Sequence, residues 1–220
     1  KKALFEKIKI CSNIEYLHSR YVKQKKITTS SAKVLLDNEL EINSDLIIGS
    51  DGYPSSSARQ SKIKYLKYNY FQSSIVGILK HDLDHENEAV QIFLPSGPLA
   101  ILPLSNNRSS FVWTMKNNEA ERRLKLDDQM FLNEMNCAFQ NRRGKIELED
   151  KKYSFPISLA LSQKIIKEKF AIIGDTAHKI HPIAGQGLNL GIRDVAALAE
   201  ILILARRLGE DIGSKMVLKR

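Results

Sequence analysis

Residues 170–194 read FAIIGDTAHKIHPIAGQGLNLGIRD, and this stretch decides the fold. The apolar run from Phe170 to Ile173 predicts a short buried strand, and the apolar residues from Leu188 onward predict a helix. A carboxylate, Asp175, a His-Pro turn and several glycines lie between them. Such a carboxylate can accept hydrogen bonds from sugar hydroxyls, and glycines let backbone N–H groups approach an anionic ligand that the helix dipole favours. The stretch therefore predicts a cofactor cradle.

A second segment, DLIIGSDG at residues 45–52, supports the same interpretation. Its continuous apolar run predicts a strand that is buried on both faces. The run ends in Asp51-Gly52, and a polar turn with Ser55 and Arg59 follows. Asp-Gly alone is a common turn, but its place directly after a buried strand indicates a functional role.

These segments resemble the flavin motifs of the class A FAD-dependent aromatic hydroxylases, and of their ubiquinone-biosynthesis branch in particular. The pattern GD-x-A-H-x-x-H-P-x-A-G-Q-G-x-N-x-G-x-x-D of that branch matches residues 174–194 at nearly every fixed position. GPLAILPL at residues 97–104, followed by Arg108 and FVW at 111–113, resembles the branch's substrate-domain hairpin. Arg59 comes one residue later than in the family pattern. The resemblance covers roughly residues 14–204.

The resemblance implies a mixed α/β (α+β) fold like that of para-hydroxybenzoate hydroxylase. The remainder of a Rossmann-like FAD-binding domain, residues 1–60 and 161–220, would be interleaved with an antiparallel-sheet substrate domain at 61–160. The chain opens with Lys1-Lys2 instead of Met, and the family's N-terminal G-x-G-x-x-G segment is absent. We therefore expect an internal fragment that also lacks the family's C-terminal end.

Local patterns predict the individual elements. The residues from Leu126 to Gln140 predict a helix with aspartate caps and with Phe131, Met135 and Phe139 on one face. The helix at about 188–208 is apolar on most faces and is expected to lie in the core. Strands are predicted at 14–18, 21–29, 32–37, 40–48, 73–80, 89–94, 99–104, 109–115, 153–159 and 170–173.

The resemblance also implies FAD as cofactor, with NADH or NADPH as the reductant. Asp175 would contact the ribityl or ribose hydroxyls, and backbone N–H groups at Gly187 would face the edge of the flavin that becomes anionic on reduction. His181 and Pro182 would shape the loop beside the isoalloxazine ring, and no side-chain acid or base is assigned. The predicted cofactor-binding residues are Asp51, Gly52, Gly174, Asp175, Pro182, Gly185, Gln186, Gly187, Leu188 and Asn189.

The implied reaction hydroxylates the aromatic ring of a polyprenylated phenol on the route to ubiquinone, through reduced flavin, O2 and a C4a-hydroperoxide. Leu102, Leu104 and Trp113 are the candidates for the substrate pocket, although Trp113 suits the sheet core equally well. Two alternatives stay open: a related flavoprotein hydroxylase or epoxidase acting on another substrate, and a non-catalytic flavin-fold binding module. His178 and His181 have a metal-like spacing, but no third ligand is near, so no metal is expected.

Composition and charge limit the classes of partner that we expect this protein to bind. Hydrophobic residues make up 43% and charged residues 27%, which is ordinary for a globular protein. The net charge is +9, but the basic residues are scattered, with small groups at 23–26, 142–145 and 164–169. We interpret these groups as solvated surface and expect no nucleic acid. A cytoplasmic location is expected. Because the implied substrate is a lipid phenol, peripheral contact of the protein with an inner membrane, or with a ubiquinone-biosynthesis complex, is a further option.

Overall fold

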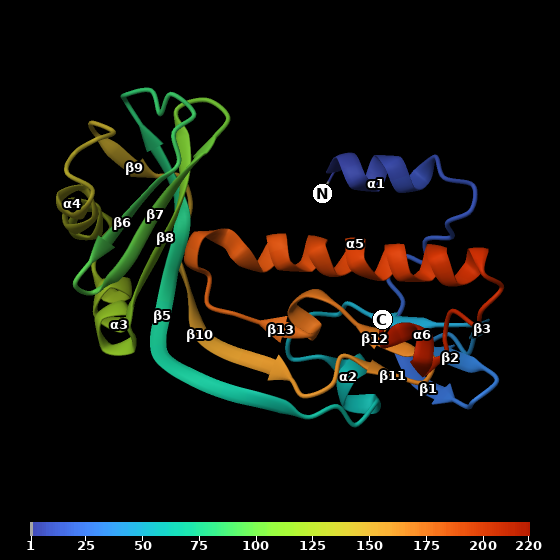
Figure 1. The fold of residues 1–220 in the computed structure, drawn as a ribbon. Coiled ribbons are helices and arrows are strands. Elements are labelled where there is room, and N and C mark those ends of the chain that lie inside the picture. The colour runs from blue at the N-terminus through green and yellow to red at the C-terminus, as the bar shows by residue number, and fades with distance from the viewer. Residues whose placement is uncertain (1) are drawn as a thin grey trace.

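The computed structural model describes residues 2–220, which form two groups of elements connected by two long strands (Figure 1). One group is a large sheet with helices on one face. The other holds two small sheets beneath a long helix. The mixed α/β fold class predicted from the sequence is confirmed, whereas the domain boundaries at about residues 60 and 160 stay a prediction.

The large sheet has seven strands in the order β13-β10-β5-β8-β7-β6, with β9 paired to β5. Every pairing in it is antiparallel, as the predicted hairpins require. Its strands are β5 (Tyr65–His81), β6 (Val90–Leu94), β7 (Gly97–Leu104), β8 (Arg108–Lys116), β9 (Ile146–Leu148), β10 (Tyr153–Ser162) and β13 (His178–Lys179).

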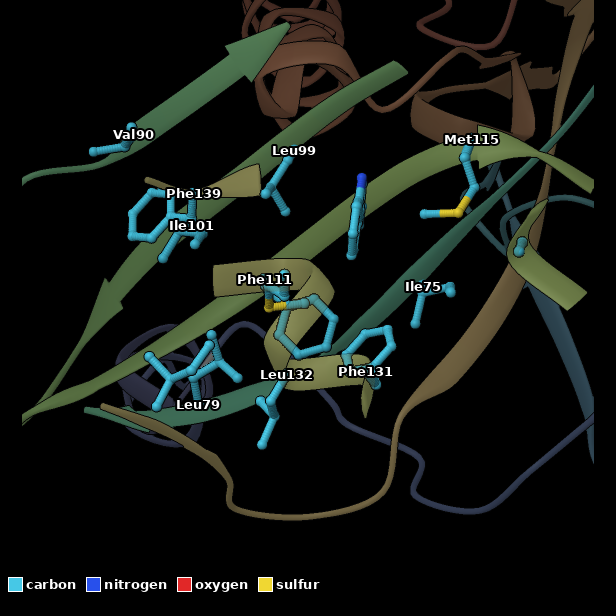
Figure 2. Packing of buried hydrophobic residues seen from close by; sticks show 14 residues of the cluster. Ile75, Leu79, Val90, Leu99, Ile101, Phe111, Met115, Phe131, Leu132 and Phe139 are labelled. Atoms are coloured by element: carbon cyan, nitrogen blue, oxygen red, sulfur yellow. The ribbon is translucent and has the colours of Figure 1, made fainter. Parts of the chain in front are cut away.

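Helices α3 (Asn117–Lys125) and α4 (Asp128–Ala138) cover one face of this sheet (Figure 1). The Asp127 side chain caps α4 by accepting a 2.8 Å hydrogen bond from the Met130 N–H, as predicted. Phe131 of α4 packs against Phe111 of β8, and both are fully buried (Figure 2). The main core therefore lies between α4 and this face. Helix α3 was not predicted, because its sequence NNEAERRLK is polar and only Ala120 is buried in it.

The opposite face of the sheet carries no helix in Figure 1 and is called the open face below. Side chains alternate along a strand, and directly paired residues share a face. Ile101 of β7 is 1% exposed in the core, so its neighbour Leu102, which is 41% exposed, lies on the open face. The pairing registers place Phe93, Ala100, Leu102, Val112, Ser74, Val76, Tyr153 and Phe155 there.

The second group contains two three-stranded sheets. The order β11-β12-β4 joins β11 (Ile166–Lys167), β12 (Phe170–Ile172) and β4 (Ile47–Gly49), and β12 pairs with β4 in parallel. The antiparallel sheet β1-β2-β3 comprises Val22–Ile27, Ala32–Leu36 and Glu41–Ser44. The helices of this group are α1 (Lys2–Lys9), α2 (Ser56–Gln60), α5 (Gln186–Arg207) and α6 (Lys215–Leu218).

Three predictions about strands were wrong. Residues 14–18 form no strand, because Tyr16 packs its ring against Phe5 of α1, with centroids 5.2 Å apart. Residues 40–48 do not form one strand but divide into β3 and β4, which belong to different sheets. β4 lies at the edge of its sheet and is not buried on both faces, since Ile48 is 43% exposed.

The final helix was also predicted incorrectly as a core helix. Only Ala205 is buried in α5, whereas Leu188, Ile192 and Val195 are more than half exposed. The reason is that α5 lies across the outside of its group, with its N-terminal end directed at the open face of the large sheet (Figure 1). Within residues 2–220, every helix is too short or too polar to span a bilayer.

Candidate functional site

Parallel pairing of β12 with β4 brings the two predicted cofactor segments together. The carboxyl ends of parallel strands meet at one edge of a sheet, so the turns after Gly49 and after Ile172 become neighbours. The Ile173 N–H donates to the Gly49 carbonyl over 3.1 Å. The Gly52 N–H donates to Thr176 Oγ1 over 2.8 Å, although these residues are 124 positions apart in the chain.

Asp51 is held by its own turn. Its carboxylate accepts hydrogen bonds from the hydroxyl of Ser55, the N-cap of helix α2, at 2.8 Å and from the backbone N–H of Ser57, in the first turn of α2, at 2.9 Å. Burial raises the pKa of Asp51, but the hydrogen bonds from Ser57 and Ser55 outweigh it and hold the pKa below the ordinary value. The Asp51 carboxylate therefore shapes the turn that positions Gly52.

Asp175 differs, because its carboxylate is exposed and accepts no hydrogen bond within residues 2–220. It lies in a short 3-10 turn, Gly174–Thr176, directly after β12. Among the described atoms outside its own helix backbone and chain neighbours, a Cβ atom built on Gly187 would come within 4 Å of Asp175 Oδ1 alone, at 3.7 Å. The Asp175 carboxylate thus stands free beside the first turn of α5.

The N-terminus of α5 is open to a ligand. Gly185 stands at its N-cap with φ +64°, and no side chain caps the helix. The first turn contains no acidic residue. The first backbone N–H groups of a helix have no acceptor within the helix, and the dipole makes this end positive. The exposed residues Gln186 and Asn189 belong to this turn. The arrangement can bind an anionic group.

The segment between β12 and α5, residues 173–185, carries several of the predicted cofactor residues and is called the cofactor loop below. Asp194, on the third turn of α5, anchors this loop to the helix. Its Oδ2 accepts a 2.7 Å hydrogen bond from the Gly174 N–H and lies 2.6 Å from His178 Nε2. The helix and the loop are in close contact here, since a Cβ built on Gly191 would lie 3.5 Å from the Gly174 Cα, an ordinary van der Waals distance. No role was predicted for Asp194. It stands in the quoted motif three positions after Gly191, and residues three apart lie on the same face of a helix.

His181 connects the cofactor loop to the large sheet. Its Nε2 lies 3.3 Å from Gln72 Oε1 on β5, and its ring meets Tyr70 edge-on with centroids 5.1 Å apart. Burial lowers the pKa of His181 from its ordinary value of 6.5, so the imidazole is neutral at pH 7. A neutral ring that donates from Nε2 to Gln72 leaves Nδ1 as an acceptor, and this buried atom has no partner among residues 2–220. Pro182 follows on the exposed side of the loop.

His181 and His178 have separate partners, Gln72 and Asp194, so the two imidazoles do not act on a common centre. Arg59, which follows the family spacing one residue late, is exposed on α2. It lines a cavity of about 700 Å³ together with Tyr53 and Tyr65. Among the described residues, neither Asp175 nor any residue of α5 lines this cavity.

The three pocket candidates do not share a face of the sheet. Leu102 and Leu104 are on the open face, whereas Trp113 is 1% exposed and packs against Phe131 in the core. Leu102 of β7 pairs with Ser110 of β8, and Ser110 pairs with Ile78 of β5. Ile78 lies six residues beyond Gln72 on that strand. At about 3.3 Å per residue, roughly 20 Å separates Leu102 from the row that contacts His181.

Nearer to His181, the open face has features that the sequence analysis missed. Ser74 and Thr114 are buried and hydrogen-bonded to each other at 2.5 Å, and Phe155, which pairs with Ser74, is 57% exposed. Gln72 is one row closer to the loop. The alternation of β5 could have indicated this face, but only the pairing register shows which β10 residues accompany it.

The sequence matches the FAD binding domain family over residues 9–211. Ubiquinone hydroxylase UbiL of Rhodospirillum rubrum is 37% identical over 177 residues, which are 80% of this chain and 41% of the relative. The mitochondrial ubiquinone biosynthesis monooxygenase COQ6 of Danio rerio is 34% identical over 216 residues, with 83% and 45% covered. The chain thus spans less than half the length of these relatives.

Solved structures share the fold. PqsL of Pseudomonas aeruginosa, a probable FAD-dependent monooxygenase, superimposes with a TM-score of 0.79 at 22% identity, over 94% of this chain and 59% of that one. Aklavinone-11 hydroxylase, solved with FAD and aklavinone, gives a TM-score of 0.69 at 16% identity, over 86% and 37%. These likenesses confirm the fold that the sequence resemblance implied.

Removal of the Asp194 carboxylate should loosen the cofactor loop. Asp194→Ala deletes the hydrogen bonds to Gly174 and His178, and hydrogen bonds to a charged group are worth about 1.5–3 kcal/mol. We expect faster amide hydrogen exchange at Gly174. Glu200→Ala, an exposed change later on α5, is the matched control. Unchanged exchange at Gly174 in Asp194→Ala would contradict the anchoring role.

Proposed function

The chain belongs to the FAD binding domain family, and from that premise we propose that it forms the flavin-binding part of an NAD(P)H-dependent monooxygenase that hydroxylates the aromatic ring of a polyprenylated phenol in ubiquinone biosynthesis. One observation carries the proposal. The uncapped N-terminus of α5 and the free carboxylate of Asp175 lie side by side, and the His181 loop connects them to the open face of the large sheet.

The residues present fit FAD. Asp175 can accept hydrogen bonds from the ribityl or ribose hydroxyls, since its carboxylate has no other partner in the described chain. Gly187 has a conventional helical backbone and open space around its missing Cβ, so a flat ring can approach the N–H groups beside it. These groups stabilise the negative charge of a reduced flavin. Bound FAD would supply the redox and oxygen chemistry, with NADH or NADPH as the electron source.

The side chains of this chain orient the reactants and keep water away. The neutral His181 holds its loop against Gln72, so the loop and the open face keep a defined separation. The backbone of residues 182–185 follows this contact directly and leads into the first turn of α5. The buried hydroxyls of Ser74 and Thr114 are hydrogen-bonded to each other and need no water. The apolar side chains around them can therefore exclude water from the reactants. No proton transfer through a side chain is needed in this proposal.

The open face suits an aromatic ring with a long apolar tail. Phe155 lies one row from Gln72, so the ring would bind near it, between the loop and the sheet. The tail would then run past Val76 and Val112 to Leu102 and Leu104, roughly 20 Å further along the strands. Apolar surface favours this path. The names of the similar proteins, ubiquinone hydroxylase and ubiquinone biosynthesis monooxygenase, support a polyprenylated phenol.

A substrate of this kind resides in a membrane. We therefore propose a cytoplasmic protein that contacts the inner membrane peripherally or joins other enzymes of ubiquinone biosynthesis there. The net charge of +9 supports attraction to an anionic bilayer surface. A related hydroxylase or epoxidase with another substrate would share the flavin site but not the tail path. A non-catalytic module would show no turnover at all.

The Asp175 carboxylate should be needed for FAD affinity. Asp175→Ala in the full-length protein removes a charged acceptor from the sugar hydroxyls, so the dissociation constant for FAD should rise about tenfold or more. Titration of the apoprotein followed by flavin fluorescence measures it. Asp37→Ala, an exposed aspartate in the turn after β2, should leave the affinity unchanged. Equal affinities in the two variants would remove Asp175 from the site.

Substitution by alanine should affect the stability of the fold in opposite directions at Gly187 and at Gly185. Gly187 has helical backbone angles and free space, so Gly187→Ala should leave the fold intact or stabilise it by up to about 1 kcal/mol, while FAD binding weakens. Gly185 has φ +64°, so Gly185→Ala should destabilise the fold itself. Chemical denaturation and FAD titration separate the two effects. Loss of stability in Gly187→Ala without loss of FAD affinity would make Gly187 a structural residue.

Charges on the open face should affect substrates according to tail length. Phe155→Glu places a charge beside the expected ring position and should lower kcat/KM for long-tailed and short-tailed phenols alike. Leu102→Glu should lower kcat/KM for the long-tailed phenol only. Both variants should retain FAD, because these side chains lie outside the flavin cradle.

Met130→Glu is the matched control, since Met130 is 58% exposed on α4 at the other side of the sheet. Ile101→Glu is unsuitable, because Ile101 is buried in the core and its variant would unfold. Turnover of both phenols by Leu102→Glu at the wild-type rate would contradict the proposed tail path.

A further inference from the structure

Two of the three basic groups that the sequence analysis assigns to solvated surface come together in space. They meet around a cavity of about 1020 Å³ between β1, α2, β11 and α6. Glu168 is the one carboxylate among its lining residues in the described chain. The lining contains six lysines: Lys25, Lys62, Lys164, Lys167, Lys215 and Lys219. We call this feature the lysine cavity.

The positive charges of the lysine cavity are not neutralised. Within residues 2–220, none of its six lysines forms an ion pair, whereas Lys23 and Lys33 on the nearby sheet pair with Glu39 and Glu41. Lys167 Nζ donates to the Ser61 carbonyl. Like charges that share a cavity repel one another, so a bound anion would relieve this repulsion.

Lys25 shows how strongly the cavity acts on its lysines. Its Nζ donates to Ser61 Oγ at 2.7 Å and lies 3.6 Å from the centre of the Phe170 ring. Burial lowers the pKa of Lys25 to about 8; Asp51 opposes this shift and Lys167 adds to it. A substantial fraction of its amine is therefore neutral at slightly alkaline pH, and an anion nearby would restore the charge.

We propose that the lysine cavity binds a phosphorylated ligand that carries an apolar group beside its phosphate. Its volume suits a small molecule or a lipid headgroup rather than a nucleic-acid duplex. Lysine ammonium groups are common partners of phosphate oxygens. Ile27, Ile165 and Ile166 also line the cavity and offer apolar contact. Two kinds of ligand have these properties: a free phosphate compound and the headgroup of an acidic phospholipid.

The test measures how fast individual lysines of the full-length, FAD-loaded protein are acetylated at pH 8. Mass spectrometry reads each site, with exposed Lys151 as the reference. An anion that raises the pKa of Lys25 by about one unit lowers its neutral fraction at pH 8, and its acetylation rate, about fivefold. Inorganic pyrophosphate and phosphatidylglycerol vesicles are the two probes. Phosphatidylcholine vesicles and sodium chloride at equal ionic strength are the controls.

Protection of Lys25 and Lys167 by pyrophosphate supports the proposal with a free phosphate compound as the source. Protection by phosphatidylglycerol vesicles alone supports it with a lipid headgroup. Absence of protection by either probe, or equal protection by sodium chloride, overturns it.

Charge reversal gives an independent check. Lys164 and Lys219 are exposed and form no ion pair in the part of the chain that the structure describes, so Lys164→Glu combined with Lys219→Glu should leave the fold and FAD content intact but abolish protection of Lys25. Lys80→Glu combined with Lys125→Glu makes the same change in net charge on the large sheet and α3, away from the cavity. Protection that survives in the first pair overturns the proposal, and protection lost in both pairs shows an effect of overall charge alone and also overturns it.

Discussion

The parallel pairing of β12 with β4 is the constraint on which the candidate site depends. It places the ends of two strands, more than a hundred residues apart in the chain, at one edge of a small sheet. The turn after β4 is then stabilised internally by Asp51, and the turn after β12 leads into α5. Without this pairing the Gly52 N–H and Thr176 would not meet, and the turn that carries Asp175 would lose its support.

Polar groups that are hydrogen-bonded within the protein hold the structure of the site, whereas polar groups without a partner are available to a ligand. Asp51 uses both carboxylate oxygens on neighbouring serines and so builds structure. Asp194 also builds structure, through one oxygen: its Oδ2 accepts from the Gly174 N–H and lies 2.6 Å from His178 Nε2. The Asp175 carboxylate has no such partner in the described chain. The Gln186 N–H donates to the Ile183 carbonyl, but no side chain in the described residues caps α5, and the helix dipole makes this end positive. A free carboxylate beside such a helix end suits a ligand with both hydroxyls and negative charge.

The large sheet serves two purposes because its side chains alternate. One face buries Phe111, Leu99 and Ile101 under α4 and supplies the stability of this half of the molecule. The other face stays open toward the end of α5, and His181 connects it to the cofactor loop through Gln72. A rigid core directly behind the open face keeps that face in position, which is what an oriented reaction beside a bound cofactor requires.

Local sequence determined the cofactor motif, most strands of the large sheet and helix α4, because turn chemistry, glycine freedom and the periods of strand and helix are properties of neighbouring residues. Tertiary structure decided which faces meet. The apolar sequence of α5 predicted a core helix, yet Leu188 and Ile192 are exposed, because burial depends on what packs against a helix. From the sequence, Trp113 was equally consistent with the sheet core and with the substrate pocket. The strand register places it in the core, where it packs against Phe131 of α4.

The same reason explains the roles of Gln72, Phe155 and the lysine cavity. Each arises from contacts between segments far apart in the chain, as when Lys25 and Lys167 come to line one cavity. Scattered charges and alternating strands give no sign of such convergence in one dimension, because a contact of this kind depends on pairing register and on the path of the chain. The sequence by itself determined the chemistry available to this protein, and the tertiary structure decided which of those groups share a site.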